Sequence, residues 1–178
     1  MSEPKYIIKI CLLGEAGVGK TSLVYRFITN KFKENYKSTL GVNLLKKDMS
    51  LKDFGDVSAQ IWDLGGQESF KSLRRLYLEG ANGALILYDT TNEDSFEKLD
   101  EWITSFREDR KDEPIILIGN KADLKNKIRI SEEDAKKFST KNNIELIITS
   151  AKTGKNVEKC FIDLTTRILE KISQEQKN

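Results

Sequence analysis

The sequence predicts a single α/β domain with a mostly parallel six-stranded sheet, one antiparallel edge strand and about five helices on both faces. Four short apolar runs, rich in strand-forming residues, are each bounded by Gly, Asn, Asp or Ser. Segments with helical spacing of apolar residues alternate with them, which is typical of parallel strands joined by right-handed crossovers. A chain of 178 residues that is 38% hydrophobic and 33% charged has the size and composition of one globular domain.

The predicted strands fall into two groups. Four are apolar on both faces, which is typical of the buried strands of parallel sheets. They are 6–13, 84–88, 115–118 and 144–148. The segments 42–51 and 57–62, on either side of the turn Asp53-Phe54-Gly55, predict a hairpin that places one strand at the sheet edge.

The predicted helices carry one apolar face each, which would pack on the sheet. Their apolar positions are Leu23, Val24, Phe27 and Ile28; Phe96, Leu99, Trp102, Ile103 and Phe106; and Val157, Cys160, Phe161, Leu164 and Ile168. Ser131, followed by three acidic residues, predicts the start of a further helix. We expect one domain over 1–178, with a core of about 5–172 and a short polar tail at 173–178.

The charge distribution argues against a nucleic-acid partner, and the cysteine content argues against a disulfide-bonded protein. Thirty basic and 28 acidic residues leave a net charge of +2 that is spread along the chain, so no nucleic-acid partner is expected. Cys11 and Cys160 lie in apolar patterns, which favours buried thiols in a reducing compartment. We therefore expect a cytoplasmic and monomeric protein.

Membrane attachment has no acceptor in the printed sequence. No run approaches the roughly 20 apolar residues of a spanning helix, and the first five residues lack the apolar centre of a secretory signal. Position 2 is Ser2, and no cysteine lies near the final Asn178, so neither myristoylation nor prenylation is expected. Peripheral association would then need partners or a missing tail.

A phosphate-binding loop follows the first predicted strand. The segment 14–21 has the spacing G-x-x-x-x-G-K-[ST] and leads directly into a helical pattern. Its backbone N–H groups and the helix N-terminus would converge on a phosphate, with Lys20 bridging the β- and γ-phosphates and Thr21 binding Mg²⁺. The predicted phosphate-binding residues are Glu15, Ala16, Gly17, Val18, Gly19, Lys20, Thr21 and Ser22.

A guanine-binding segment is predicted after the strand 115–118. Asp123 would accept two hydrogen bonds from guanine, whereas adenine offers no matching pair of donors. Lys121 would lie along the base plane, and Asn120 would tie this segment to the phosphate loop. After the next strand, a backbone N–H of Ser150, Ala151 or Lys152 would donate to the guanine carbonyl oxygen, although this triplet is equally compatible with a simple turn.

The residues for magnesium binding and hydrolysis are predicted in two further loops. Asp63 ends a strand and would hold the magnesium shell, Gly66 would donate a backbone N–H to the γ-phosphate, and Gln67 would orient the attacking water. An ordinary strand-to-helix turn also explains the two glycines before Gln67. Thr39 is the candidate for a second magnesium-binding hydroxyl, with Ser38 as a local competitor.

Five elements have now been described: the phosphate loop 14–21, the loop with Thr39, the segment 63–67, the segment 120–123 and the triplet 150–152. In this order and spacing they resemble the Ras superfamily of small GTPases, a group of P-loop NTPases with a common G domain. The resemblance covers residues 5 to about 172 and implies two switch loops, near 32–41 and 63–78. It implies that Phe32 packs against the guanine, that Tyr36 covers the phosphates and that Thr39 binds magnesium. Within the superfamily, 38–42, 62–63, 70–77 and 88–89 are most similar to the Rab branch.

Three departures accompany this resemblance. Ala16 stands where Ras proper has glycine, and its methyl would crowd the space that a partner's arginine enters. Leu64-Gly65 is similar to the Asp-x-Gly-Gly-Gln of the Arf branch. The usual lipidation cysteine is missing. The activator and effector set is therefore not specified by the resemblance.

The predicted function is a switch that binds GTP, GDP and Mg²⁺ and hydrolyses GTP slowly. Lys20, Mg²⁺ and backbone amides would stabilise the transition state, Gln67 would position the water, and an arginine supplied by a partner would accelerate the reaction roughly 10³- to 10⁵-fold. Effectors, exchange factors and GTPase-activating proteins are expected at the switch loops. The alternatives are a scaffold that binds GTP without hydrolysis and an ATP-dependent phosphoryl-transfer enzyme.

Overall fold

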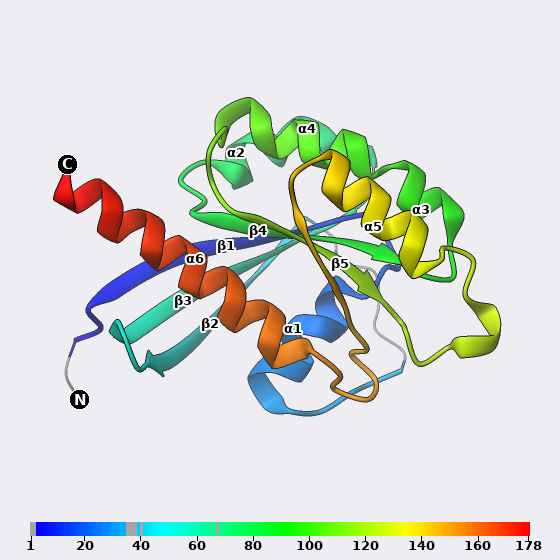
Figure 1. The fold of residues 1–178 in the computed structure, drawn as a ribbon, viewed down its shortest axis with the longest axis horizontal. Helices are drawn as coiled ribbons and strands as arrows, with labels where there is room; N and C mark the ends of the chain where they lie inside the picture. Colours follow the sequence, from blue (N-terminus) through cyan, green and yellow to red (C-terminus); the bar gives the residue numbers. More distant parts are fainter. Residues whose placement is uncertain (1–2, 35–38, 40, 67) are drawn as a thin grey trace.

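The computed structural model describes residues 3–34, 39, 41–66 and 68–178. Within these residues, six strands form one sheet in the order β2-β3-β1-β4-β5-β6 (Figure 1). The strands are β1 (Tyr6–Leu13), β2 (Val42–Leu51), β3 (Gly55–Leu64), β4 (Gly83–Asp89), β5 (Ile115–Asn120) and β6 (Glu145–Ile148). Only the β2–β3 pair is antiparallel among the pairings of the described strands, which confirms the predicted edge hairpin.

The strand register brings the loops that are expected to carry function to one end of the sheet, where the parallel strands end. Leu12 pairs with both Asp63 on β3 and Leu85 on β4. Farther along the sheet, Asp89 pairs with Asn120 at the ends of β4 and β5. Because these strands are parallel, the loops that follow them lie side by side, as is usual for ligand sites in doubly wound sheets.

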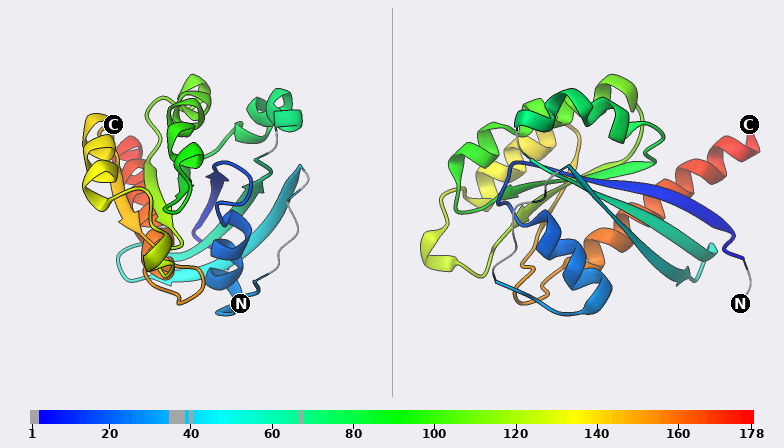
Figure 2. Two further views of the ribbon diagram at one scale, coloured as in Figure 1. Left: turned by 90° about the vertical axis from the view of Figure 1, so that its right-hand side faces the viewer. Right: turned by 180° about the vertical axis from the view of Figure 1, so that it is seen from behind.

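Helices cover both faces of the sheet (Figure 2). One face packs against α1 (Lys20–Thr29) and α6 (Val157–Lys177), and its buried core contains Ile8, Ile10 and Phe161. The other core contains Leu13, Ile86 and Trp102. It packs against α2 (Arg74–Leu78), α3 (Glu93–Glu97), α4 (Leu99–Asp109) and α5 (Glu132–Lys141). Two short 3-10 helices, η1 (Glu68–Leu73) and η2 (Lys125–Lys127), lie in loops.

Three details differ from the sequence-based expectation. The helical pattern over 96–106 forms two segments, because Lys98 at their junction has φ −80° and ψ −4°. The helix α6 continues to Lys177, so most of the expected polar tail is helical. Residues 68–78 form η1 and α2, which the apolar periodicity did not predict. Among the described residues, no helix is both long and apolar enough to cross a membrane.

Candidate functional site

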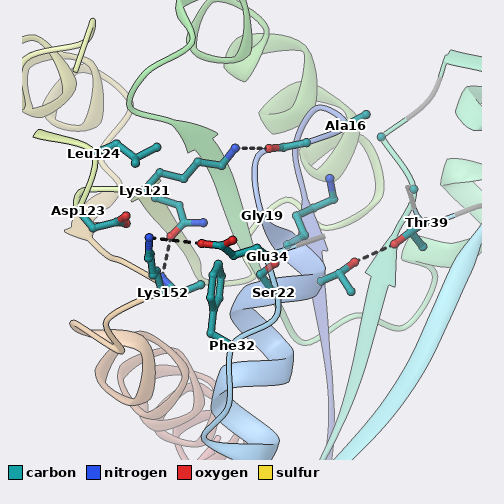
Figure 3. A pocket seen from close by; sticks show the side chains of 17 residues that line it. Ala16, Gly19, Ser22, Phe32, Glu34, Thr39, Lys121, Asp123, Leu124 and Lys152 are labelled. Atoms are coloured by element: carbon teal, nitrogen blue, oxygen red, sulfur yellow. Dashed lines mark hydrogen bonds and ion pairs between the residues drawn. The ribbon is translucent and has the colours of Figure 1, made fainter. Parts of the chain in front are cut away.

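A pocket of about 390 Å³ opens at the edge of the sheet where the parallel strands end (Figure 3). Asp123, Phe32 and Lys152 lie at one end of the view and Thr39 lies at the other. Most of the residues predicted to bind the nucleotide or the metal line this pocket. They are Ala16, Gly17, Gly19, Lys20, Thr21, Ser22, Phe32, Thr39, Gly66, Asn120, Lys121, Asp123, Ala151 and Lys152.

The phosphate loop directs a buried ammonium group into this pocket. The Nζ atom of Lys20 donates to the carbonyl oxygens of Gly14, at 2.7 Å, and of Glu15, at 2.9 Å. Burial lowers the pKa of Lys20 to about 8, and the carboxylates of Asp63 and Glu15 oppose this shift. The carbonyl contacts orient the ammonium group without neutralising it, so the loop is suited to bind an anion.

Asn120 joins three loops around the start of α1. Its side-chain Nδ2 donates to the carbonyl oxygen of Val18 at 3.0 Å. Its Oδ1 accepts from Thr149 Oγ1 at 3.0 Å and from the backbone N–H of Ala151 at 3.3 Å. Gly19 has φ +99°, and a Cβ at this position would collide with Nδ2 of Asn120. Glycine is therefore required both by the backbone conformation and by the close approach of Asn120.

Lys121 and Asp123, which follow Asn120, place a cation and a carboxylate at the end of the pocket away from Thr39. Lys121 has φ +67°, and its Nζ contacts the carbonyl oxygen of Gly17 at 2.7 Å and Oδ2 of Asp89 at 2.8 Å. Its alkyl chain is thereby stretched across the wall of the pocket. Ser150 Oγ donates to Oδ1 of Asp123 at 2.7 Å, which fixes this carboxylate.

Three residues that the sequence reasoning missed also line the pocket. Gly65 precedes the predicted Gly66, Leu124 adds an apolar wall beside Asp123, and Glu34 pairs with Lys152 at 3.5 Å. The position of Leu124 directly after Asp123, the acid predicted to bind guanine, was an available signal, since a purine needs an apolar wall. Nothing in the sequence indicated the Glu34–Lys152 pair, because the two charges lie on separate loops.

Two hydroxyl groups and a carboxylate meet at the phosphate end of the pocket. Thr21 Oγ1 donates to Oδ2 of Asp63 at 2.5 Å and lies 2.8 Å from Thr39 Oγ1. Asp63 is fully buried, and its Oδ1 has no hydrogen-bond partner within the part of the chain that the structure describes. Burial raises the pKa of Asp63, and the hydrogen bond from Thr21 opposes this shift. A buried acceptor of this kind is costly unless a donor or a cation satisfies it.

The backbone after β3 lies directly on the phosphate loop. A Cβ at Gly66 would lie 2.7 Å from the carbonyl oxygen of Gly14 and closer still to the amide nitrogen of Ala16. Gly65 donates its N–H to the carbonyl oxygen of Gly41 at 2.6 Å. These contacts bring both predicted switch segments to the phosphate end of the pocket.

The remaining predicted site residues do not line the pocket themselves. Val18 and Ser150 are buried beside the pocket wall, and Asp63 lies behind Thr21. The carboxylate of Glu15 accepts a hydrogen bond from Trp102 instead of lining the pocket. Tyr36, Gln67 and the competitor Ser38 lie outside the described residues.

The comparisons with known proteins identify the family. Residues 9–170 match the model of the Ras family. This chain belongs to the Ras family. The "Ras-related protein Rab-2B" of Dictyostelium discoideum is 39% identical over 94% of this chain and 83% of its own length. The "GTP-binding protein ypt3" of Schizosaccharomyces pombe is 40% identical over 96% and 80%, and "Ras-related protein RABA1c" of Arabidopsis thaliana is 37% identical over 93% and 77%.

Membership of this family gives the protein its general activity. It is a Rab-like small GTPase, a switch that binds GTP and GDP and hydrolyses GTP. Its partners are guanine nucleotides together with regulator and effector proteins. The fold class, the enzyme class and the Rab likeness predicted from the sequence are thereby confirmed.

Proposed function

We propose that the pocket binds GTP with its guanine between Lys121 and Phe32 and its γ-phosphate beside Lys20 and Thr39, and that the resulting switch acts in vesicle traffic. The positions of the pocket-lining residues support this orientation. The traffic role rests on the Rab and Ypt relatives. The observation that carries the proposal is that a buried ammonium group, Lys20, and an anchored carboxylate, Asp123, line one pocket.

In this orientation Asp123 distinguishes guanine from adenine. Ser150 occupies one side of its Oδ1, and the remaining lone pairs accept the ring N–H and the exocyclic amine of guanine. Adenine lacks this pair of donors, so its binding would leave the carboxylate unpaired. The N–H of Ala151, which donates to Asn120 Oδ1 at 3.3 Å, is assigned a second, shared hydrogen bond to the guanine carbonyl oxygen.

The oxygen atoms of Thr21, Thr39 and Asp63 fit a magnesium ion. They are hard ligands, and Mg²⁺ in phosphate sites is usually held by few protein oxygens together with phosphates and water. The buried Oδ1 of Asp63 supplies an acceptor that the surrounding protein does not satisfy. When bound, Mg²⁺ would neutralise charge that develops on the phosphates.

In this proposal, hydrolysis depends on positioning the attacking water and stabilising charge on the phosphates, more than on a strong general base. We assign Gln67 to the orientation of the attacking water and Lys20 to the stabilisation of charge on the β- and γ-phosphates. We assign to the N–H of Gly66, whose backbone lies against the phosphate loop, a hydrogen bond to the γ-phosphate. Loss of that phosphate removes contacts from Thr39 and Gly66, so both switch loops and their protein partners respond to the hydrolysis.

The regulatory surface follows from the same residues. Tyr36 is assigned to cover the phosphates, and effectors, exchange factors and activators to bind the switch loops. Ala16 lies in the pocket wall, so its methyl group narrows the path for a partner's arginine. The Arf-like Leu64-Gly65 pair is expected to select a distinct set of partners. Residues 1–178 are proposed to act as one monomeric domain.

The experiment that tests this proposal is phosphate release from GTP at saturating magnesium. The wild-type protein is expected to release phosphate slowly, and Gln67→Leu is expected to reduce the rate constant by roughly 10- to 100-fold while GTP affinity changes less than about twofold. Equal rate constants would instead favour a GTP-binding scaffold. Preferential binding of ATP over GTP would reject the assignment of Asp123.

A further inference from the structure

An arginine on the first helix binds the loop that follows β6. Arg26 is half-buried near the C-terminal end of α1, and its Nε donates to the carbonyl oxygen of Ala151 at 2.8 Å. Its Nη2 donates to the carbonyl oxygen of Lys152. Both oxygens belong to the triplet 150–152, which is proposed to bind the guanine carbonyl group. The planar guanidinium fork thus holds two successive peptide groups of this loop.

The same guanidinium group also closes the end of its own helix. Its Nη1 donates to the carbonyl oxygen of Asn30 at 3.0 Å, and the N–H of Asn30 donates to the carbonyl oxygen of Arg26 at 2.8 Å. A cation at this end of a helix is favourable because the last carbonyl oxygens have no partner within the helix. Phe32 follows Asn30 by two residues and lies at the same end of the pocket as Lys152 (Figure 3). Arg26 therefore joins two segments that border the same end of the pocket.

The geometry of the peptide bond turns these contacts into an orientation of N–H groups. The peptide bond between Ala151 and Lys152 is trans, so its C=O and N–H bonds point in opposite directions. Because Arg26 holds the carbonyl oxygen of Ala151, the N–H of Lys152 points away from Arg26. The N–H of Ala151, one position earlier, is oriented by Asn120 Oδ1. Two neighbouring N–H groups of the loop are thus held in fixed orientations.

Contacts from Arg26 also lead to the carboxylate that is proposed to bind guanine. The carbonyl oxygen of Lys152 accepts from Arg26, and the N–H of the same peptide group belongs to Thr153. That N–H donates to Ser150 Oγ at 3.1 Å, and Ser150 Oγ donates in turn to Oδ1 of Asp123. Every bond in this series donates in the same direction, from the guanidinium group toward the carboxylate, and such bonds polarise one another. Loss of the cation would therefore weaken the support of Asp123.

We propose that Arg26 is a positioning residue for guanine recognition, which orients the N–H groups of the loop 150–152 toward the base carbonyl oxygen and supports Asp123. The inference rests on the proposed orientation of the guanine in the pocket. Within the part of the chain that the structure describes, the pocket lining does not include Arg26, so it acts through the loop and not by contact with the nucleotide. Its removal should speed the release of guanine nucleotides and leave the magnesium dependence of release unchanged.

A second arginine provides a matched control. Arg167 lies on α6 and binds Oε2 of Glu145, which begins β6 at the opposite end of that strand from the loop 150–152. Its side chain is 45% exposed, and exposed ion pairs contribute little. Arg167→Gln should leave the rate constant of GDP release within about twofold of wild type. Arg26→Lys keeps the positive charge but loses the planar fork, so it separates charge from geometry.

The experiment measures dissociation of GDP and of 6-thio-GDP, in which sulfur replaces the guanine carbonyl oxygen and the ring N–H and exocyclic amine remain. Arg26→Gln is expected to speed GDP release roughly tenfold, and Arg26→Lys roughly threefold, since hydrogen bonds from a charged group are lost. In wild type the sulfur should speed release roughly fivefold, because it accepts hydrogen bonds more weakly than oxygen. In Arg26→Gln this factor should fall below about twofold, because the N–H groups that distinguish the two atoms are no longer held in place.

Chelation of magnesium provides the readout at the other end of the pocket. A chelator should speed GDP release by the same factor in Arg26→Gln and in wild type. A smaller chelator effect in the variant would show that the change reaches the phosphate end, and it would overturn the inference. Release from Arg26→Gln at the wild-type rate would overturn it as well. So would faster release with an unchanged sulfur effect, which is the result that a purely structural contact predicts.

Asp123→Asn separates failure of this inference from failure of the proposed function. Impaired GDP binding in Asp123→Asn together with normal release from Arg26→Gln would overturn the role of Arg26 alone. Normal GDP binding in Asp123→Asn would overturn the proposed orientation of the guanine and this inference with it. Should Arg26→Gln fail to fold in a thermal melt, Arg26→Lys decides by the same measurements of GDP and 6-thio-GDP release.

Discussion

The two ends of the pocket differ in how completely the protein satisfies its own polar groups. At the guanine end, Asn120 makes three hydrogen bonds, Lys121 has two oxygen partners and Asp123 is held by Ser150. At the phosphate end, a buried carboxylate oxygen of Asp63 lacks a partner among the described residues. Burial there also lowers the pKa of Lys20 and raises that of Asp63.

This difference indicates that the two ends of the pocket have separate roles. In the proposed account, the guanine end is already ordered by hydrogen bonds within the protein, and it would select the base by complementarity. The phosphate end would be completed by the proposed phosphate beside Lys20 and magnesium ion beside Asp63. Because these ligands would depend on the nucleotide state, the phosphate end would be the part of the pocket that reports hydrolysis to other proteins.

The largest effect is expected from a change at the guanine end. Asp123→Asn replaces one acceptor by an N–H₂ group that faces the donors of guanine, so affinity for GDP should fall by roughly 10³- to 10⁴-fold while binding of adenine nucleotides stays weak. Competition titration with a fluorescent nucleotide measures this loss. Asp53→Asn is the matched control, because Asp53 lies in the exposed turn between β2 and β3, at the end of the strands opposite the pocket. A loss below about tenfold would mean that Asp123 does not read the base.

A smaller and magnesium-dependent effect is expected at the phosphate end. Asp63→Asn removes the charge that supports the metal and should speed GDP release by about 10- to 100-fold at millimolar magnesium. A chelator should abolish the difference between this variant and wild type, whereas the loss in Asp123→Asn should persist under chelation. Release rates that differ equally with and without magnesium would contradict the separation of the two ends.

The smallest effect is expected from the exposed pair across the pocket mouth. Glu34 and Lys152 are 71% and 52% exposed in their side chains, so Glu34→Gln should change GDP release by less than about twofold. Measurement at low and high salt tests this expectation, since any small difference should disappear as salt screens the charges. A larger, salt-resistant change would show that this pair closes the pocket.

Local patterns were sufficient to predict most of the fold, and most of the predicted site residues line one pocket, while their roles in binding and hydrolysis stay predictions. The phosphate loop and the Asn120 segment each follow an apolar strand directly, so their chemistry could be placed at one edge of the sheet before the structure was known. The predicted edge hairpin is also confirmed. It could be predicted because alternating residues and a glycine turn specify a hairpin locally. Tyr36 and Gln67 stay predictions, since they lie outside the described residues.

Contacts between distant segments could not be predicted in the same way. Trp102 has the spacing of a core residue, and its sequence pattern gives no sign that its indole N–H reaches Glu15, which lies 87 residues away. The break at Lys98 depends on backbone geometry within an otherwise continuous apolar pattern. The close approach of Gly66 to the phosphate loop likewise depends on how β1 and β3 pair.

The most direct test of the central claim is to identify the nucleotide that purifies with the wild-type protein. Denaturation of the protein followed by chromatography should release close to one guanine nucleotide per chain, mostly as GDP, because the guanine end is preformed and the hydrolysis product stays bound. Release of adenine nucleotide in its place, or guanine nucleotide bound equally well by Asp123→Asn, would contradict the account.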